Sequence, residues 1–323
     1  MTVPRRQFLQ LAAGAAALPV LTRIARAQAY PTRAVRILVG FAAGGGTDIV
    51  ARLTGQWLSE RLGQQFIIEN RPGAATNIAT EAVVRSPADG YTLLLATPAN
   101  AINATLYDKL RFNFIRDTVP IGGIMRVPNV MAVNPSVPAE TVPDFIAYAK
   151  ASPGAINYAF AGGSVQMSAE LFKMMTGINM IGVPYRGAAL ALTDLIAGRV
   201  QVMFANLPSS IEQIRAGKLR ALAVTTWTRS EALPEIPTVD SFVPGYEVSA
   251  FFGLSAPRNT PAEIVAKLNN EINSALADDK FKVRLTELNG MTLGGSRFEF
   301  GSLIAYETGR WGNVIRAANI KPE

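Results

Sequence analysis

Short apolar runs alternate along most of the chain with segments in which apolar residues recur at helical spacing. After a first predicted strand at 35–41, the predicted strands are 66–69, 92–96, 156–161, 180–185, 200–204 and 219–225. The predicted helices are 47–62, 142–151, 168–175, 188–197 and 208–216. Strands that alternate with amphipathic helices predict an α/β architecture with mainly parallel sheets.

Capping boxes predict where two later helices begin. In a capping box, a hydroxyl residue and an acidic residue three positions later satisfy each other's free backbone donors. Thr260 with Glu263 and Ser296 with Glu299 have this spacing. We therefore expect helices that start directly after 260 and after 296.

Two extended segments, 121–135 and 245–257, indicate a division into two lobes. The residues between them have their own alternation of strands and helices and the length of a domain. We predict a discontinuous first lobe at 28–131 and 249–323 and an inserted second lobe at 132–248. Two extended connections make a hinged clamp. The carboxyl ends of the strands, where open α/β sheets bind ligands, would then face the cleft between the two lobes.

The first strand-to-helix turn carries the strongest functional signal. Its candidate ligand-binding residues are Ala43, Gly44, Gly45, Gly46, Thr47 and Asp48. Three glycines leave backbone N–H groups accessible, and the first helical turn adds free donors and a partial positive charge. Such a turn suits a small anion, but it lacks the lysine of a nucleotide-binding Walker loop. A tight turn without a ligand is an equal alternative, and Asp48 could simply complement the helix dipole.

Two further turns have the same character. The turn after the predicted strand 156–161 offers Gly163, Ser164 and Gln166, and the turn after 180–185 offers Tyr185, Arg186, Gly187 and Ala188. Glycine is common at such turns, so each alone is weak evidence. Together they predict that closure of the clamp brings helix N-termini from both lobes onto one small anion.

The N-terminus resembles an export signal. Arg5-Arg6 precedes an apolar stretch at 11–21, and Ala25 and Ala27 form a small-x-small cleavage site. We predict a twin-arginine signal peptide at 1–27, cleavage after Ala27 and a periplasmic protein. A mitochondrial presequence and an uncleaved anchor are the alternatives.

The amino-acid composition limits the kinds of functional site that the chain can form. The chain has no Cys and no His, which excludes thiolate sites and removes the commonest general base and metal ligand. Of the 31 basic residues, 4 lie before residue 28, which leaves 27 basic against 24 acidic residues, or +3, in the mature chain. Neither this charge nor any basic run indicates a nucleic-acid partner.

The chain resembles the Bug-type substrate-binding receptors of tripartite tricarboxylate transporters over nearly its whole mature length. The resembling stretches lie at 30–31, 37–39, 43–49, 69–74, 89–95, 134–138, 183–187, 192–196, 217–224, 233–239, 252–254 and 310–311. The resemblance implies a two-lobed, type II periplasmic-binding-protein (Venus-flytrap) fold that closes on a small organic carboxylate without cofactor, metal or chemistry. It also implies delivery to membrane permease subunits and ligand contacts from the three turns. We add Asn100 and Asn206 as candidate contacts.

Two departures from the family concern the ligand. The turn at 162–167 is shorter than usual and lacks a His, and Ala205 stands where the family commonly has Asp. Without that carboxylate near the cleft, we expect a ligand that carries no ammonium group.

Two other functions compete with a transport receptor. An exported α/β enzyme would act on a small carboxylate, and a sensory component would present its ligand to a membrane kinase. The sequence alone leaves the identity of the carboxylate open.

Overall fold

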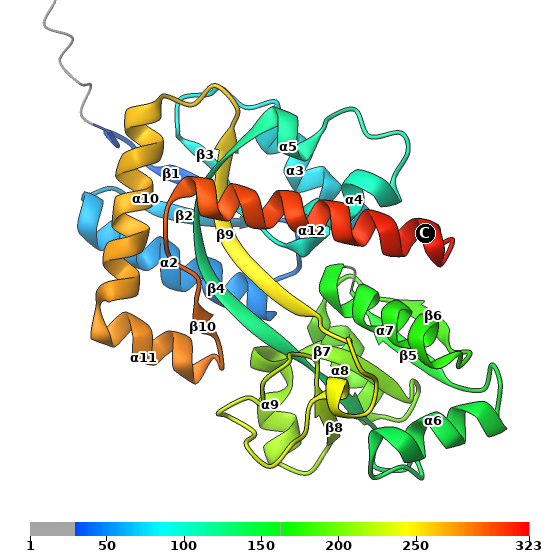
Figure 1. Cartoon of the computed structure of the whole chain (residues 1–323). Coiled ribbons are helices and arrows are strands. Elements are labelled where there is room, and N and C mark those ends of the chain that lie inside the picture. Colours follow the sequence, from blue (N-terminus) through cyan, green and yellow to red (C-terminus); the bar gives the residue numbers. More distant parts are fainter. Residues whose placement is uncertain (1–29, 162, 323) are drawn as a thin grey trace, which may run out of the picture.

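The computed structural model describes residues 30–161 and 163–322, which form two lobes joined by two long strands (Figure 1). The strands are β1 (Val35–Val39), β2 (Phe66–Asn70), β3 (Thr92–Ala96), β4 (Thr118–Val133), β5 (Asn157–Phe160), β6 (Ile181–Pro184), β7 (Val202–Asn206), β8 (Arg220–Val224), β9 (Ser249–Pro257) and β10 (Met291–Thr292). The α-helices are α2 (Gly46–Leu62), α3 (Asn77–Val84), α4 (Pro98–Leu106), α5 (Phe114–Asp117), α6 (Val142–Ala151), α7 (Gly163–Thr176), α8 (Ala188–Ile196), α9 (Leu207–Arg215), α10 (Ala262–Ala277), α11 (Asp279–Glu287) and α12 (Arg297–Ala317).

Each lobe has a parallel group of strands at its centre. In the upper lobe of Figure 1, β1 pairs in parallel with β2 and β3, and in the lower lobe β5 pairs in parallel with β6 and β7. The main path of the sheet is β2-β1-β3-β9-β4-β7-β5-β6, with β8 and β10 attached to β4. The predicted two-lobed α/β class is therefore confirmed. The sheet pairs that involve β4 or β9 are antiparallel.

The crossover strands β4 and β9 explain the two extended segments of the sequence. They pair antiparallel from Thr118↔Pro257 to Pro128↔Ser249, and all nine residues of β9 are buried. β4 continues into the lower lobe, where it pairs with β7 and β8. The predicted lobe boundary at 131/132 falls inside β4, and the one at 248/249 falls where β9 begins.

The two largest of the four apolar clusters among the described residues belong mainly to different lobes. One contains β1 residues such as Val39 with Leu58 of α2, and the other contains Phe145 of α6, Phe172 of α7 and Phe204 of β7. Helix α12 crosses the upper lobe against α4 and β4, and its Trp311 and Ile315 join the lower-lobe core. The C-terminal helix thus contacts both lobes.

One of the two predicted capping boxes is confirmed. Ser296 Oγ accepts a bond from the Glu299 N–H (3.2 Å), and Glu299 Oε2 accepts one from the Ser296 N–H (2.7 Å). The prediction at Thr260 is wrong, because Pro261 occupies the N-cap of α10. The Thr260 hydroxyl instead donates to Pro257 O at 2.8 Å, which closes the turn that follows β9.

Helix α7 begins at Gly163, five residues before the predicted start at 168. Gly163 has φ +59°, a backbone conformation that favours glycine and turns the chain into the helix. Ser164, Val165 and Gln166 therefore belong to the first helical turn rather than to a loop. Within the described ranges 30–161 and 163–322, the search for a helix long and apolar enough to cross a membrane finds none.

We predict that Gly253→Ala in β9 destabilises the protein by about 1–3 kcal/mol, because close-packed cores resist added atoms. The new Cβ would lie 2.6 Å from the Gly122 carbonyl oxygen of β4 and would overlap the Phe300 ring of α12. Urea unfolding measures the loss. Gly309→Ala in α12 is the control: its Cβ meets nothing within 4 Å, so this change should stabilise the helix by about 0.5–1 kcal/mol. Equal stabilities of the two variants would contradict the prediction.

Candidate functional site

The glycine turn after β1 is held by Asp48. Its carboxylate accepts bonds from Gly44 N–H (3.0 Å), Arg52 Nε (2.9 Å) and Asn70 Nδ2 (3.0 Å). Burial alone would raise the pKa of Asp48, but the hydrogen bonds from Arg52, Gly44 and Asn70 outweigh it and hold the pKa below its ordinary value. Asp48 therefore has a structural role in shaping the turn.

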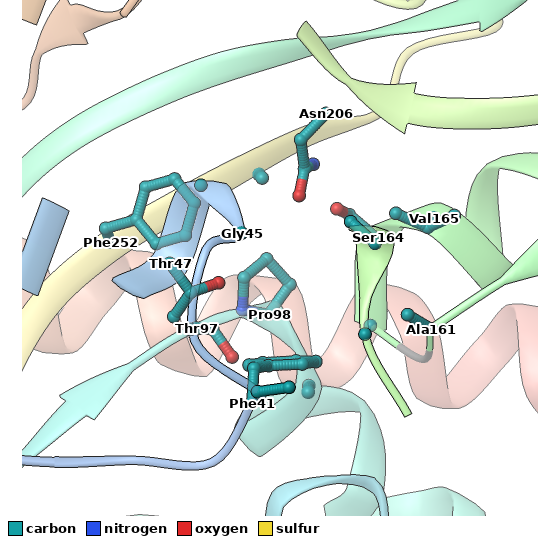
Figure 2. A pocket seen from close by; sticks show the side chains of 17 residues that line it. Phe41, Gly45, Thr47, Thr97, Pro98, Ala161, Ser164, Val165, Asn206 and Phe252 are labelled. Carbon is teal, nitrogen blue, oxygen red and sulfur yellow. The ribbon is translucent and has the colours of Figure 1, made fainter. Parts of the chain in front are cut away.

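Five helices begin around one cavity between the lobes, which we call the inter-lobe cavity (Figure 2). The upper lobe contributes the N-termini of α2 and α4, and the lower lobe contributes those of α7, α8 and α9. The residues from these five ends are Gly45, Gly46, Thr47, Thr97, Pro98, Ala99, Gly163, Ser164, Val165, Gly187, Ala188 and Asn206. Each helix end brings free N–H groups and a partial positive charge. The arrangement therefore favours an anion.

Among residues 30–161 and 163–322, no charged side chain lines the inter-lobe cavity. Its other walls are apolar and come from Phe41, Ala42, Ala161, Ala250 and Phe252. The volume is about 40 Å³. At roughly 10–15 Å³ for one water, this is room for a group of about three heavy atoms, the size of a carboxylate.

Three polar side chains point into the cavity. Figure 2 shows the hydroxyls of Thr47 and Ser164, from opposite lobes, and the side-chain oxygen of Asn206 directed at the same space. Thr47 is 8% exposed and Ser164 is 5% exposed. The cavity thus combines two hydroxyls that can donate with one amide oxygen that can only accept.

A second, larger cavity of about 360 Å³ adjoins the first and shares Phe41 and Ala161 with it. Gln166, Tyr185 and Arg186 line this second cavity. Burial and the hydrogen bond from Tyr185 Oη to Asp194 Oδ2 (2.8 Å) raise the pKa of Tyr185 to about 12. Arg186 is exposed, so the larger cavity carries positive charge at its solvent side.

Comparison with known proteins identifies the family. Residues 50–320 match the model of the tripartite tricarboxylate transporter family receptor. Protein BugT of Bordetella pertussis is 35% identical over 301 residues, which are 91% of this chain and 92% of that protein. The chain belongs to this receptor family.

Solved structures of relatives have the same fold. The structure of R. palustris Rpa4515 with adipate is 41% identical with a TM-score of 0.88, and it covers 91% of this chain and 100% of that one. The periplasmic binding protein BugD is 30% identical (TM-score 0.86; 91% and 100% covered). MatC of Rhodopseudomonas palustris, with bound malate, is 30% identical (TM-score 0.85; 88% and 100% covered). Of these three relatives, one is described as a periplasmic binding protein and two were solved with a carboxylate.

The receptor's structure sorts the residues predicted from sequence into three groups. Gly45, Gly46, Thr47, Gly163, Ser164, Gly187, Ala188 and Asn206 line the inter-lobe cavity, and Gln166, Tyr185 and Arg186 line the second cavity. Ala43, Gly44, Asp48 and Asn100 line neither. Asn100 is buried and works as a cap: it accepts from Thr97 N–H (2.8 Å) and donates to Thr80 Oγ1 (2.8 Å).

Sequence reasoning missed the contribution of α4. Thr97-Pro98 directly follows a strand that the pattern had predicted, and a hydroxyl residue before proline is a common helix start. The aromatic walls Phe41 and Phe252 had no such signal, because they come from distant parts of the chain.

The prediction of a ligand without an ammonium group assumed that residue 205 lies at the cleft, but Ala205 does not. It is fully buried in the lower-lobe core, opposite Val130 of β4, and does not line the cavity. Its neighbour Asn206 is the residue of β7 that reaches the cavity.

We predict that Asp48→Asn lowers the free energy of unfolding by about 1–3 kcal/mol at pH 7, since hydrogen bonds to a charged group are lost. The pKa of Asp48 is depressed, so its stabilisation is present above the ordinary value of 3.8 and is lost as pH falls through the folded-state pKa. The gap between wild type and variant should therefore close at low pH. Urea unfolding at several pH values measures this.

Asp279→Asn is the control. Asp279 also lies in the first turn of a helix, but its side chain is 96% exposed and 3.4 Å from Lys282. Its loss should cost well under about 1 kcal/mol. A gap for Asp48→Asn that stays constant with pH would contradict the assigned role.

Proposed function

We propose that this receptor captures a small organic carboxylate in the inter-lobe cavity by closure of the lobes. It then delivers the ligand to the membrane permease subunits of a tripartite tricarboxylate-type transporter. The observation that carries the proposal is the convergence of five helix N-termini on a cavity to which the described part of the chain contributes no charged side chain. The adipate and malate in two related structures are carboxylates of the expected class.

Helix ends bind a carboxylate without a counter-ion. Each N-terminus carries roughly half an elementary positive charge, and its N–H groups are fixed by the helix before the ligand arrives. Thr47 and Ser164 add hydroxyl donors from the two lobes. Because each lobe supplies only some of the hydrogen-bond donors, the site is complete only when the lobes close.

The remainder of the ligand would extend past Phe41 and Ala161 into the second cavity. There Gln166 and Tyr185 offer neutral polar groups, and Arg186 offers a cation for a second acidic group. The larger volume of this cavity suits a ligand body of several carbons.

Export of the receptor by the twin-arginine route is part of the proposal. The signal at 1–27 and its cleavage site after Ala27 lie outside the described residues. Replacing both Arg5 and Arg6 with Lys should leave the uncleaved precursor in the cytoplasm, as measured by fractionation and immunoblot. Undiminished periplasmic protein would refute this route.

We predict that Gly45→Val weakens adipate binding at least about tenfold with little loss of stability. The backbone of Gly45 (φ −87°, ψ 168°) suits a β-branched residue, and a new Cβ meets nothing within 4 Å. The added side chain would therefore occupy ligand space and block the N–H groups at the start of α2. Calorimetry measures the affinity.

Thr47→Val is the matched variant, since it removes one hydroxyl at nearly constant volume. It should weaken binding less than Gly45→Val, because one donor of several is lost. A folded Gly45→Val protein with unchanged affinity for adipate would contradict the proposed site.

A further inference from the structure

The two lobes approach each other around the inter-lobe cavity through residues with little or no side chain. A Cβ added to Gly187 of the lower lobe would lie 3.2 Å from Ala42 Cβ of the upper lobe, and one added to Gly163 would lie 3.5 Å from Ala99 Cβ. Glycine at these two positions lets the backbones of the lobes come close together. The walls of the cavity are thus completed by contacts between the lobes themselves.

Like partial charges face each other across this cavity. Each of its five helix ends carries roughly half an elementary positive charge. Among the described residues, no carboxylate lines the cavity to offset these charges. Because walls such as Phe41 and Phe252 are apolar, the charges are also weakly screened. An anion between the helix ends therefore stabilises the closed lobes, whatever molecule it belongs to.

Two buried hydroxyls in the cavity also favour an acceptor. Neither the hydroxyl of Thr47 nor that of Ser164 makes a hydrogen bond to another described residue. Both residues are more than nine-tenths buried, and Figure 2 shows both hydroxyls directed into the cavity. A buried polar group without a partner costs about 1–3 kcal/mol. One anion in the cavity would give a partner to a hydroxyl from each lobe.

The size of the cavity limits which anion fits within it. Room for about three heavy atoms suits a single-atom halide and one water, whereas sulfate has too many atoms. The water has a defined place, because Asn206 Nδ2 donates to Asn129 Oδ1, whose amide nitrogen is bound to Ser168 Oγ (2.9 Å). This leaves Asn206 Oδ1 directed into the cavity as an acceptor. The water would donate one proton to this oxygen and the other to the halide.

We propose that the inter-lobe cavity is a self-contained site for a small monovalent inorganic anion of the size of chloride. This anion holds the lobes closed in the absence of a carboxylate and competes with the carboxylate for the same helix ends. The inference rests on the proposed carboxylate site. The inorganic anion differs from the carboxylate ligand in that it needs no contact with Tyr185 or Arg186 of the second cavity. The apparent affinity of the receptor for its carboxylate then depends on the surrounding chloride concentration.

Calorimetry with adipate on the full mature receptor tests the competition. Sodium chloride replaces sodium sulfate at constant ionic strength, so that the screening of Arg186 stays the same. The apparent Kd for adipate should rise in proportion to chloride, by at least about twofold up to about 0.15 M. Equal affinities for adipate in chloride and in sulfate would overturn the inference and leave the carboxylate site intact.

Three variants separate the cavity from the exposed cation beside it. Thr47→Val and Ser164→Ala each remove one hydroxyl, so the chloride concentration that halves the affinity for adipate should rise about fivefold. Arg186→Gln is the matched control, because it removes the charge at the second cavity and leaves the inter-lobe cavity unchanged. It should leave that chloride concentration unchanged. If Arg186→Gln instead abolishes the effect of chloride, the anion acts at the second cavity and the inference is wrong.

Bromide can locate the anion directly. In crystals grown from sodium bromide without a carboxylate, an anomalous peak should lie between the hydroxyls of Thr47 and Ser164, and adipate should displace it. Bromide bound only elsewhere would overturn the inference. If bromide occupies the cavity but neither adipate nor malate binds, the proposed carboxylate function fails and the inorganic anion site stands. If adipate binds and bromide does not enter the cavity, the carboxylate function stands alone.

Discussion

The antiparallel pairing of β4 with β9 is the constraint on which the site depends. The two strands pass between the lobes side by side, with the rest of each lobe built outward from them. Because each lobe places its parallel strands beside these crossovers, the carboxyl ends of the strands face the space between the lobes. A helix begins at each of these ends, so one sheet topology accounts for the five helix N-termini at the inter-lobe cavity.

The lack of charged side chains among the described residues that line this cavity has an energetic reason. A buried guanidinium would need its own partner whenever the site held no anion, and an unpaired buried charge is costly. Backbone donors at helix ends carry no such cost, since their partial charge belongs to the helix. Charged groups are instead placed where they are paired or hydrated: Asp48 braces the first turn, and Arg186 lies exposed at the second cavity.

A group of four ionic side chains stabilises the region where α12 crosses the connecting strands. Arg310 Nη1 lies 2.9 Å from Glu247 Oε2, and Arg126 Nη2 lies 3.7 Å from Glu247 and 3.8 Å from Glu307. Burial raises the pKa of Glu307, and the charges of Arg310 and Arg126 oppose that rise. These contacts connect α12 to β4 and to the residues just before β9, so the C-terminal helix is attached to the connecting strands and not to one lobe alone.

The parts of the site that the sequence revealed are those with local causes. Gly44–Gly46, Gly163 and Gly187 mark helix starts because the signal and the structure lie within a few residues of each other. Thr97-Pro98 carries the same kind of local signal, although the helix that starts there was not among those predicted. The wrong capping box at Thr260 shows the limit of such local signals, since the Thr260 hydroxyl bonds Pro257 O and closes the turn before α10 instead of capping the helix. The orientation of the Asn206 amide has no local cause. It depends on Asn129, which lies 77 residues before Asn206, and on Ser168, which lies 39 residues after Asn129. A motif predicts that an amide lies at the cavity, but only the tertiary contacts decide whether it presents a donor or an acceptor there.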